Sequence, residues 1–186
     1  GQANGSGASM TIGELAMTAG TIYVDPEYGH STLQIDSLAN DTLNANIKAG
    51  HGAFVTIGAN ADTAKNAVSK LNDFDSVQSV LYIAKPFKIG DRNILVTSEP
   101  IGPDIDGGDI DISLLDDASA GTPVTITGNS ALVIDQSTVG SSYVISNSNI
   151  SFEGDGRLGI VNANVGTVVL TNGTVSGLTD EAISTD

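Results

Sequence analysis

Short β-rich segments recur along the last third of the chain and limit the fold more than any other feature of the sequence. They begin 7 to 11 residues apart and are separated by Gly, Asn, Ser or Asp: VTI (124–126), LVI (132–134), YVI (143–145), ISF (150–152), GIV (159–161) and VVL (168–170). The pattern predicts all-β structure from residue 121 onward, as a sandwich, a roll or a short β-helix. The intervals are too irregular to predict a solenoid repeat.

The first half of the chain contains one segment with helical periodicity, at residues 60–73. Its apolar residues recur three and four positions apart and form a single narrow stripe: Ala64, Ala67, Val68 and Leu71. Asn60 or Asp62 can cap the start of this helix. Alternating apolar residues and Gly or Pro turns surround it. We therefore expect a mainly β chain with one amphipathic helix, in which an α+β N-terminal half precedes an all-β C-terminal half.

The change in composition near the middle of the chain predicts four parts: a flexible tail or tag remnant at residues 1–9, an α+β domain at 10–102, an acidic linker and strand at 103–120, and an all-β domain at 121–186. We expect few contacts between the two domains. The start of the chain allows two interpretations. Either Met10 is the initiator and residues 1–9 remain from a tag, or residue 1 is the end left after removal of a pro-segment.

The charge of the chain argues against several classes of function. Asp and Glu total 22 against 7 Lys and Arg, which gives a formal net charge of -15. Nucleic-acid binding needs cations that displace counterions from phosphates, and anionic membrane surfaces attract basic segments, so neither partner is expected. No apolar run approaches the roughly 18 residues of a membrane span, so membrane insertion is not expected either. The absence of Cys removes disulfides and thiol chemistry.

An acidic segment at residues 102–117, GPDIDGGDIDISLLDD, holds six aspartates and no basic residue. From residue 109 onward, apolar and polar residues alternate strictly, which predicts a strand with one solvated face. Four aspartates beside two glycines are candidate calcium ligands: Asp104, Asp106, Asp109 and Asp111. The spacing of the helix-loop-helix calcium loop is missing. We therefore favour a linker and strand, and expect at most a weak calcium site and no other cofactor.

Other motifs have simpler interpretations than catalysis. GDGRLG at residues 154–159 matches the dinucleotide-binding pattern, but a strand-like β-branched segment follows where that motif needs a helix, so we predict a hairpin turn. His30 and His51 each follow a glycine in a predicted loop and lack a ligand-spaced partner, so they are interpreted as surface residues. No nucleophile elbow is present. A carboxylate pair for sugar cleavage remains an alternative, although the chain has no Trp for stacking sugar rings.

These patterns together favour a non-enzymatic structural protein that acts by assembly. We expect a virion component of a phage, such as a capsid decoration (head accessory) protein. The first alternative is a bacterial or archaeal cell-surface module of an S-layer, filament or adhesin, which would be extracellular. The second is a polysaccharide-acting, tailspike-like enzyme. Because the chain has few of the lysines that protect sheet edges, we expect it to associate with itself, with a trimer favoured, and with a larger body such as a capsid or surface lattice.

Overall fold

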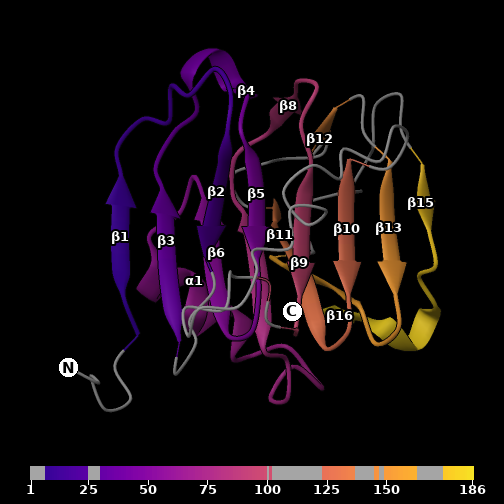
Figure 1. The fold of residues 1–186 in the computed structure, drawn as a ribbon. Coiled ribbons are helices and arrows are strands. Elements are labelled where there is room, and N and C mark those ends of the chain that lie inside the picture. Colours follow the sequence, from indigo (N-terminus) through magenta and orange to yellow (C-terminus); the bar gives the residue numbers. More distant parts are fainter. Residues whose placement is uncertain are drawn as a thin grey trace, which may run out of the picture.

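The computed structural model describes residues 7–24, 30–99, 101, 123–136, 145–146, 149–162 and 174–186. The protein is mainly β with one α-helix, and every strand pair in this part of the chain is parallel. The strands form three sheets. Two larger sheets face each other, and β1 and β15 lie at opposite ends of the molecule (Figure 1).

The seven-stranded sheet has the order β1-β3-β6-β7-β11-β14-β16. Its strands are β1 (Ser9–Ile12), β3 (Ser31–Ile35), β6 (Ala53–Ile57), β7 (Ser79–Ile83), β11 (Ser130–Asp135), β14 (Arg157–Val161) and β16 (Ile183–Thr185). The six-stranded sheet has the order β15-β13-β10-β9-β5-β2. It consists of β15 (Val175–Ser176), β13 (Ile150–Glu153), β10 (Val124–Thr127), β9 (Ile94–Thr97), β5 (Asn46–Ala49) and β2 (Thr21–Val24).

A third, short sheet joins the two larger ones on one side. It has the order β12-β8-β4 and consists of β12 (Ile145–Ser146), β8 (Phe87–Ile89) and β4 (Thr42–Leu43). The 3-10 helix η1 (Ala39–Asp41) precedes β4, and η4 (Asp180–Ala182) precedes β16. The chain repeatedly passes from the seven-stranded sheet to the six-stranded sheet and back, so the arrangement is that of a β-solenoid. We call one such passage a coil.

The winding is doubled at two places. After β6 the chain forms α1 (Ala61–Val68) and returns to the same sheet as β7, beside β6. After β9 it returns to the six-stranded sheet as β10, beside β9. Each large sheet therefore gains one extra strand, so after β10 the two sheets again gain one strand each per coil. Between these two places, β7 lies two positions from β3 in one sheet, whereas β9 lies next to β5 in the other.

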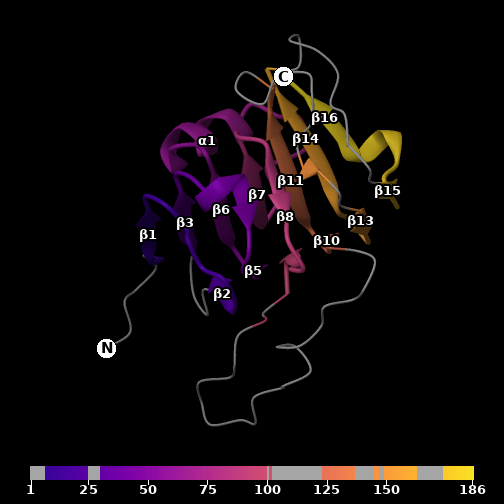
Figure 2. The same cartoon turned by 90° about the horizontal axis from the view of Figure 1, so that it is seen from above.

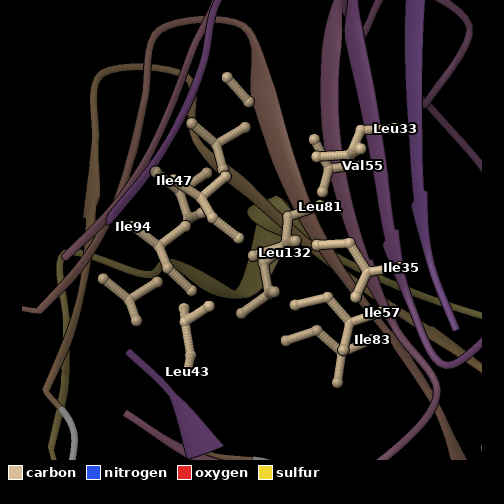
Figure 3. Close-up of a cluster of buried hydrophobic side chains, with 14 of the residues drawn as sticks. Leu33, Ile35, Leu43, Ile47, Val55, Ile57, Leu81, Ile83, Ile94 and Leu132 are labelled. Atoms are coloured by element: carbon tan, nitrogen blue, oxygen red, sulfur yellow. The ribbon is translucent and has the colours of Figure 1, made fainter. Parts of the chain in front are cut away.

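Side chains at matching positions of successive strands stack into ladders inside the solenoid. One ladder of the seven-stranded sheet runs in register through five neighbouring strands, from β3 to β14. Its members are Leu33, Val55, Leu81, Leu132 and Leu158. It faces residues of the six-stranded sheet such as Ile47 and Ile94 across the interior (Figure 3). Val55, Leu81 and Leu132 are fully buried. Burial of each such side chain contributes about 1.5–3 kcal/mol, so these ladders supply the main stabilisation of the fold.

Helix α1 lies against the outer face of the seven-stranded sheet (Figure 2). The Asn60 side chain caps it by accepting hydrogen bonds from the backbone N–H groups of Asp62 (3.0 Å) and Thr63 (3.2 Å). The helix ends at Val68, five residues before its predicted end. The apolar stripe continues because Leu71 lies in the turns that follow and still packs against the sheet.

Glycines form the corners between the six-stranded and seven-stranded sheets. Gly128 connects β10 to β11 with φ 64°, and Gly154 connects β13 to β14 with φ 57°. Both angles lie in the left-handed region, which favours glycine. At Gly156 a Cβ atom would lie 2.7 Å from the carbonyl oxygen of Ile126 in the coil below. The hairpin predicted for residues 154–159 is wrong, because β13 and β14 belong to different sheets and the segment is a corner.

The expectation of few contacts between the two halves of the chain is also wrong. Strand β7 pairs with β11, and β9 pairs with β10, so strands from both sides of residues 103–120 are neighbours in two sheets. A single buried cluster contains residues from both sides, for example Leu81 and Leu132. Of the three arrangements predicted for the C-terminal half, the parallel pairing matches the short β-helix. The predicted linker and strand at 103–120 lie outside the described residues.

Candidate functional site

The ends of the solenoid interrupt its apolar ladders. The ladder that contains Leu33 and Leu158 continues to Met10 in β1 and to Ile183 in β16. Its members from Leu33 to Leu132 are buried and Leu158 is partly buried, whereas Met10 is 62% exposed and Ile183 is 39% exposed. The interior stacking pattern therefore extends to both ends of the molecule, and its last member at each end faces solvent.

A ladder of the six-stranded sheet ends in a similar way. It runs through the coils in register: Ile22, Ile47, Ile94, Val124, Ile150 and Val175. Its inner members are buried, but Val175 is 47% exposed and Ile22 is only partly buried. Two parallel rows of apolar side chains thus reach solvent at the same two ends.

The end strands β1, β2, β15 and β16 lack the usual protection of free sheet edges. Their sequences are SMTI, TIYV, VS and IST, which contain no charged residue and no proline. Within the part of the chain that the structure describes, no strand pairs with the outer edges of these four strands. Uncharged free edges are ready templates for pairing with another strand. The two ends are therefore the strongest candidate interaction surfaces of the molecule.

Acidic side chains flank both ends. Glu14 follows β1 and is exposed, and Asp180 and Glu181 are exposed in η4 just before β16. These charges lie beside the free edges, in the segments that connect the end strands. Like charges of this kind oppose the approach of a second acidic surface, and salt screens them over a Debye length of roughly 8 Å at physiological ionic strength.

A polar pocket lies on the outer face of the seven-stranded sheet, between the turn after α1 and the C-terminal segment. Its volume is about 280 Å³, and its lining includes Asp73, Phe74, Arg157, Glu181 and Ser184. The Arg157 Nε and Ser184 Oγ atoms are buried without a hydrogen-bond partner among the described residues. Phe74 is only 5% exposed, so its ring is covered and offers little surface for stacking a sugar.

Side-chain hydrogen bonds connect the C-terminal ends of β7, β11 and β14 on the outer face of the seven-stranded sheet. The Tyr82 hydroxyl donates to Asp135 Oδ2 (2.9 Å), and Asn162 Nδ2 donates to Asp135 Oδ1 (2.8 Å). Burial raises the pKa of the Tyr82 phenol well above its usual range, and the hydrogen bond to Asp135 raises it further. The phenol therefore stays protonated at neutral pH, so it acts as a structural donor here rather than as a base.

The residues that the sequence singled out as sites are placed as follows. The four candidate calcium ligands lie outside the described residues: Asp104, Asp106, Asp109 and Asp111. The weak calcium site therefore stays a prediction. His30 and His51 are described and exposed. The described residues contain no group of three or more His, Asp or Glu side chains that could hold a metal ion. Likewise, no helix among them has the length and apolar character needed to cross a membrane.

Sequence reasoning missed the exposed ends of the ladders. The residues Met10, Val175 and Ile183 are ordinary apolar residues in short segments, and nothing in their neighbours marks them as functional. Their position becomes informative only when the register of the parallel strands is known. In comparisons with known proteins, no family model matches the chain, and no curated protein or solved structure matches it either.

Proposed function

We propose that this chain is a non-enzymatic structural protein that acts by assembly. The observation that supports this most is the exposure of Met10 and Ile183, the two ends of one ladder whose middle members are buried. Burying these residues and pairing the free edges against another strand would extend the same packing that stabilises the middle of the solenoid. The uncharged end strands allow such pairing, because no lysine or proline blocks it.

The favoured version of this function is a phage virion component, such as a capsid decoration protein that docks on a capsid lattice. The acidic charge of -15 and the absence of Cys support it as compositional arguments. The protein would associate with itself, with a trimer favoured from the sequence, and would be located in the virion. The alternative is an extracellular S-layer, filament or adhesin module. The neighbouring genes separate the two, because capsid and portal genes would support the virion.

A polysaccharide-acting enzyme is the second alternative, and one observation favours it. Asp73 and Glu181 line the same polar pocket as Arg157, so two acidic residues and one basic residue belong to one pocket. Carboxylate pairs of this kind cleave glycosidic bonds in many enzymes. The covered ring of Phe74 argues against a sugar site. The enzyme would be favoured if the protein cleaves a glycan and the Asp73→Asn variant loses this activity while its assembly is unchanged.

The assembly function is tested by native mass spectrometry and sedimentation across a series of protein and salt concentrations. We expect association that strengthens with salt, because each added copy brings another net charge of -15 that salt must screen. Incubation with candidate capsids or surface lattices under the same conditions tests docking. A protein that stays monomeric at high concentration and high salt, and that binds none of these bodies, would contradict the proposal.

A further inference from the structure

We propose that two copies of this chain stack head to tail, with β16 of one copy pairing in parallel with β1 of the next and β15 pairing with β2. This inference rests on the proposed assembly function and specifies its partner, a second copy, and its geometry. Both contacts would continue the sheets that already run through each copy, so the stacked copies would share two continuous parallel sheets and a continuous interior.

The topology makes the two ends complementary. Strands β1 and β16 are the outermost strands of one sheet, and β2 and β15 are the outermost strands of the other. All described strand pairs are parallel, so a copy placed beyond β16 in the same orientation presents its β1 in the direction that β16 requires. Pairing in this orientation uses the free edge of one copy against the opposite free edge of the next, as in every internal coil.

The ladders fix the register of the contact. Met10 pairs with Leu33 and Ile183 pairs with Leu158, and these four residues belong to one ladder. Continuing that ladder places Met10 of the next copy beside Ile183. In the other sheet, continuing the ladder places Ile22 beside Val175. One arrangement therefore covers the exposed apolar side chains of both sheets at once.

The distribution of charge disfavours tail-to-tail contact. Tail-to-tail contact would bring two copies of the acidic segment around Asp180 and Glu181 together, which doubles the like charge at the interface. Head-to-tail contact opposes that segment to an end where Glu14 is the exposed acid next to β1. A head-to-tail contact is heterologous, so it produces open stacks unless its rotation closes a ring. The trimer predicted from the sequence would require such closure.

Disulfide trapping between single-cysteine variants tests the register directly, because the chain has no cysteine of its own. The proposed register places Thr11 of one copy beside Ser184 of the preceding copy. Neighbouring strands lie about 4.8 Å apart, which is within the Cα separation that a disulfide spans. Thr11→Cys and Ser184→Cys proteins, mixed and mildly oxidised, should form a covalent dimer that contains one of each.

Two controls make the test specific. Ser9→Cys lies on the same face of β1, two residues from position 11, and should form at least tenfold less cross-link with Ser184→Cys. Each variant oxidised alone should form no dimer. A second pair, Thr21→Cys and Thr174→Cys, occupies the equivalent position in the six-stranded sheet. It gives an independent result if a substitution at position 184 prevents folding, which circular dichroism would show.

The outcomes separate the stacking geometry from the assembly function. Dimers of Thr11→Cys alone or Ser184→Cys alone would overturn the head-to-tail polarity. Equal cross-linking from position 9 would overturn the register. Oligomers in native mass spectrometry without either mixed cross-link would overturn this geometry and leave the assembly function standing. A strict monomer would overturn the stacking, and it would contradict the assembly function as well only if the protein also binds no capsid or surface lattice.

Discussion

The middle coils and the end coils of this solenoid contain the same kind of ladder, but they differ in what lies on either side of each strand. Leu81 has a ladder neighbour in β6 and another in β11, and it is fully buried. Ile183 has a neighbour only in β14, and it is 39% exposed. A repeated coil therefore stabilises its neighbours but cannot cover its own last surface, which leaves the ends available for interaction.

The largest expected difference between the two regions is in stability. Leu81→Ala in the middle should lower the free energy of unfolding by about 2–5 kcal/mol, because the substitution leaves a cavity in a closely packed ladder. Ile183→Ala at the end should lower it by only about 0.5 kcal/mol, since that side chain is already partly solvated. Urea unfolding at low protein concentration measures both. Equal losses would show that the end coils are as well covered as the middle.

The next difference concerns association. Met10→Lys should weaken self-association at least tenfold, because a charge on a free edge opposes strand pairing and the contact loses about 1.5–3 kcal/mol of apolar burial. Met17→Lys is the matched control, since Met17 is also exposed but belongs to no strand. Sedimentation equilibrium measures the dissociation constants. If both substitutions weaken association equally, charge rather than the ladder position governs the contact.

The smallest difference is expected at the glycines. Gly128→Ala should destabilise the protein by about 1–2 kcal/mol, because the corner requires φ 64° and a Cβ atom would crowd Ser98. Gly13→Ala, in the first coil, should change stability by less than about 0.5 kcal/mol, since no atom lies within 4 Å of the added Cβ. Thermal unfolding of the two variants tests this. A neutral Gly128→Ala would mean that the corner can relax.

The positions of many strands could be predicted from the sequence, whereas their pairing could not. The segments at 124–126, 132–134, 150–152 and 159–161 all lie in strands. Alternating β-branched residues specify an extended backbone, but they do not specify which edge pairs with which. The irregular spacing that argued against a solenoid has a structural reason, because successive segments belong to different sheets: 124–126 and 150–152 lie in the six-stranded sheet, and 132–134 and 159–161 lie in the seven-stranded sheet. Glycine corners and hairpin turns also have the same composition.

The candidate interface was the least predictable part. The shortage of edge lysines suggested that the chain assembles, and the end strands indeed contain none. Which residues would meet could not be derived, because Met10 and Ile183 are 173 positions apart and become members of one row only through the register of five intervening strands. Sequence periodicity contains local information, while an exposed ladder end is a property of the whole pairing order.

The two doubled windings have a consequence for how a chain like this can change in length. The winding from β6 to β7 adds one strand to one sheet, and the winding from β9 to β10 adds one strand to the other. The first shifts the two sheets by one strand relative to each other, as a frameshift would, and the second removes that shift. Deleting the helical crossover alone would displace every later coil by one strand spacing, about 4.8 Å, on one side only. Insertions and deletions at these two places would therefore be tolerated as a pair, and the segment between them is the part of the winding that is out of frame.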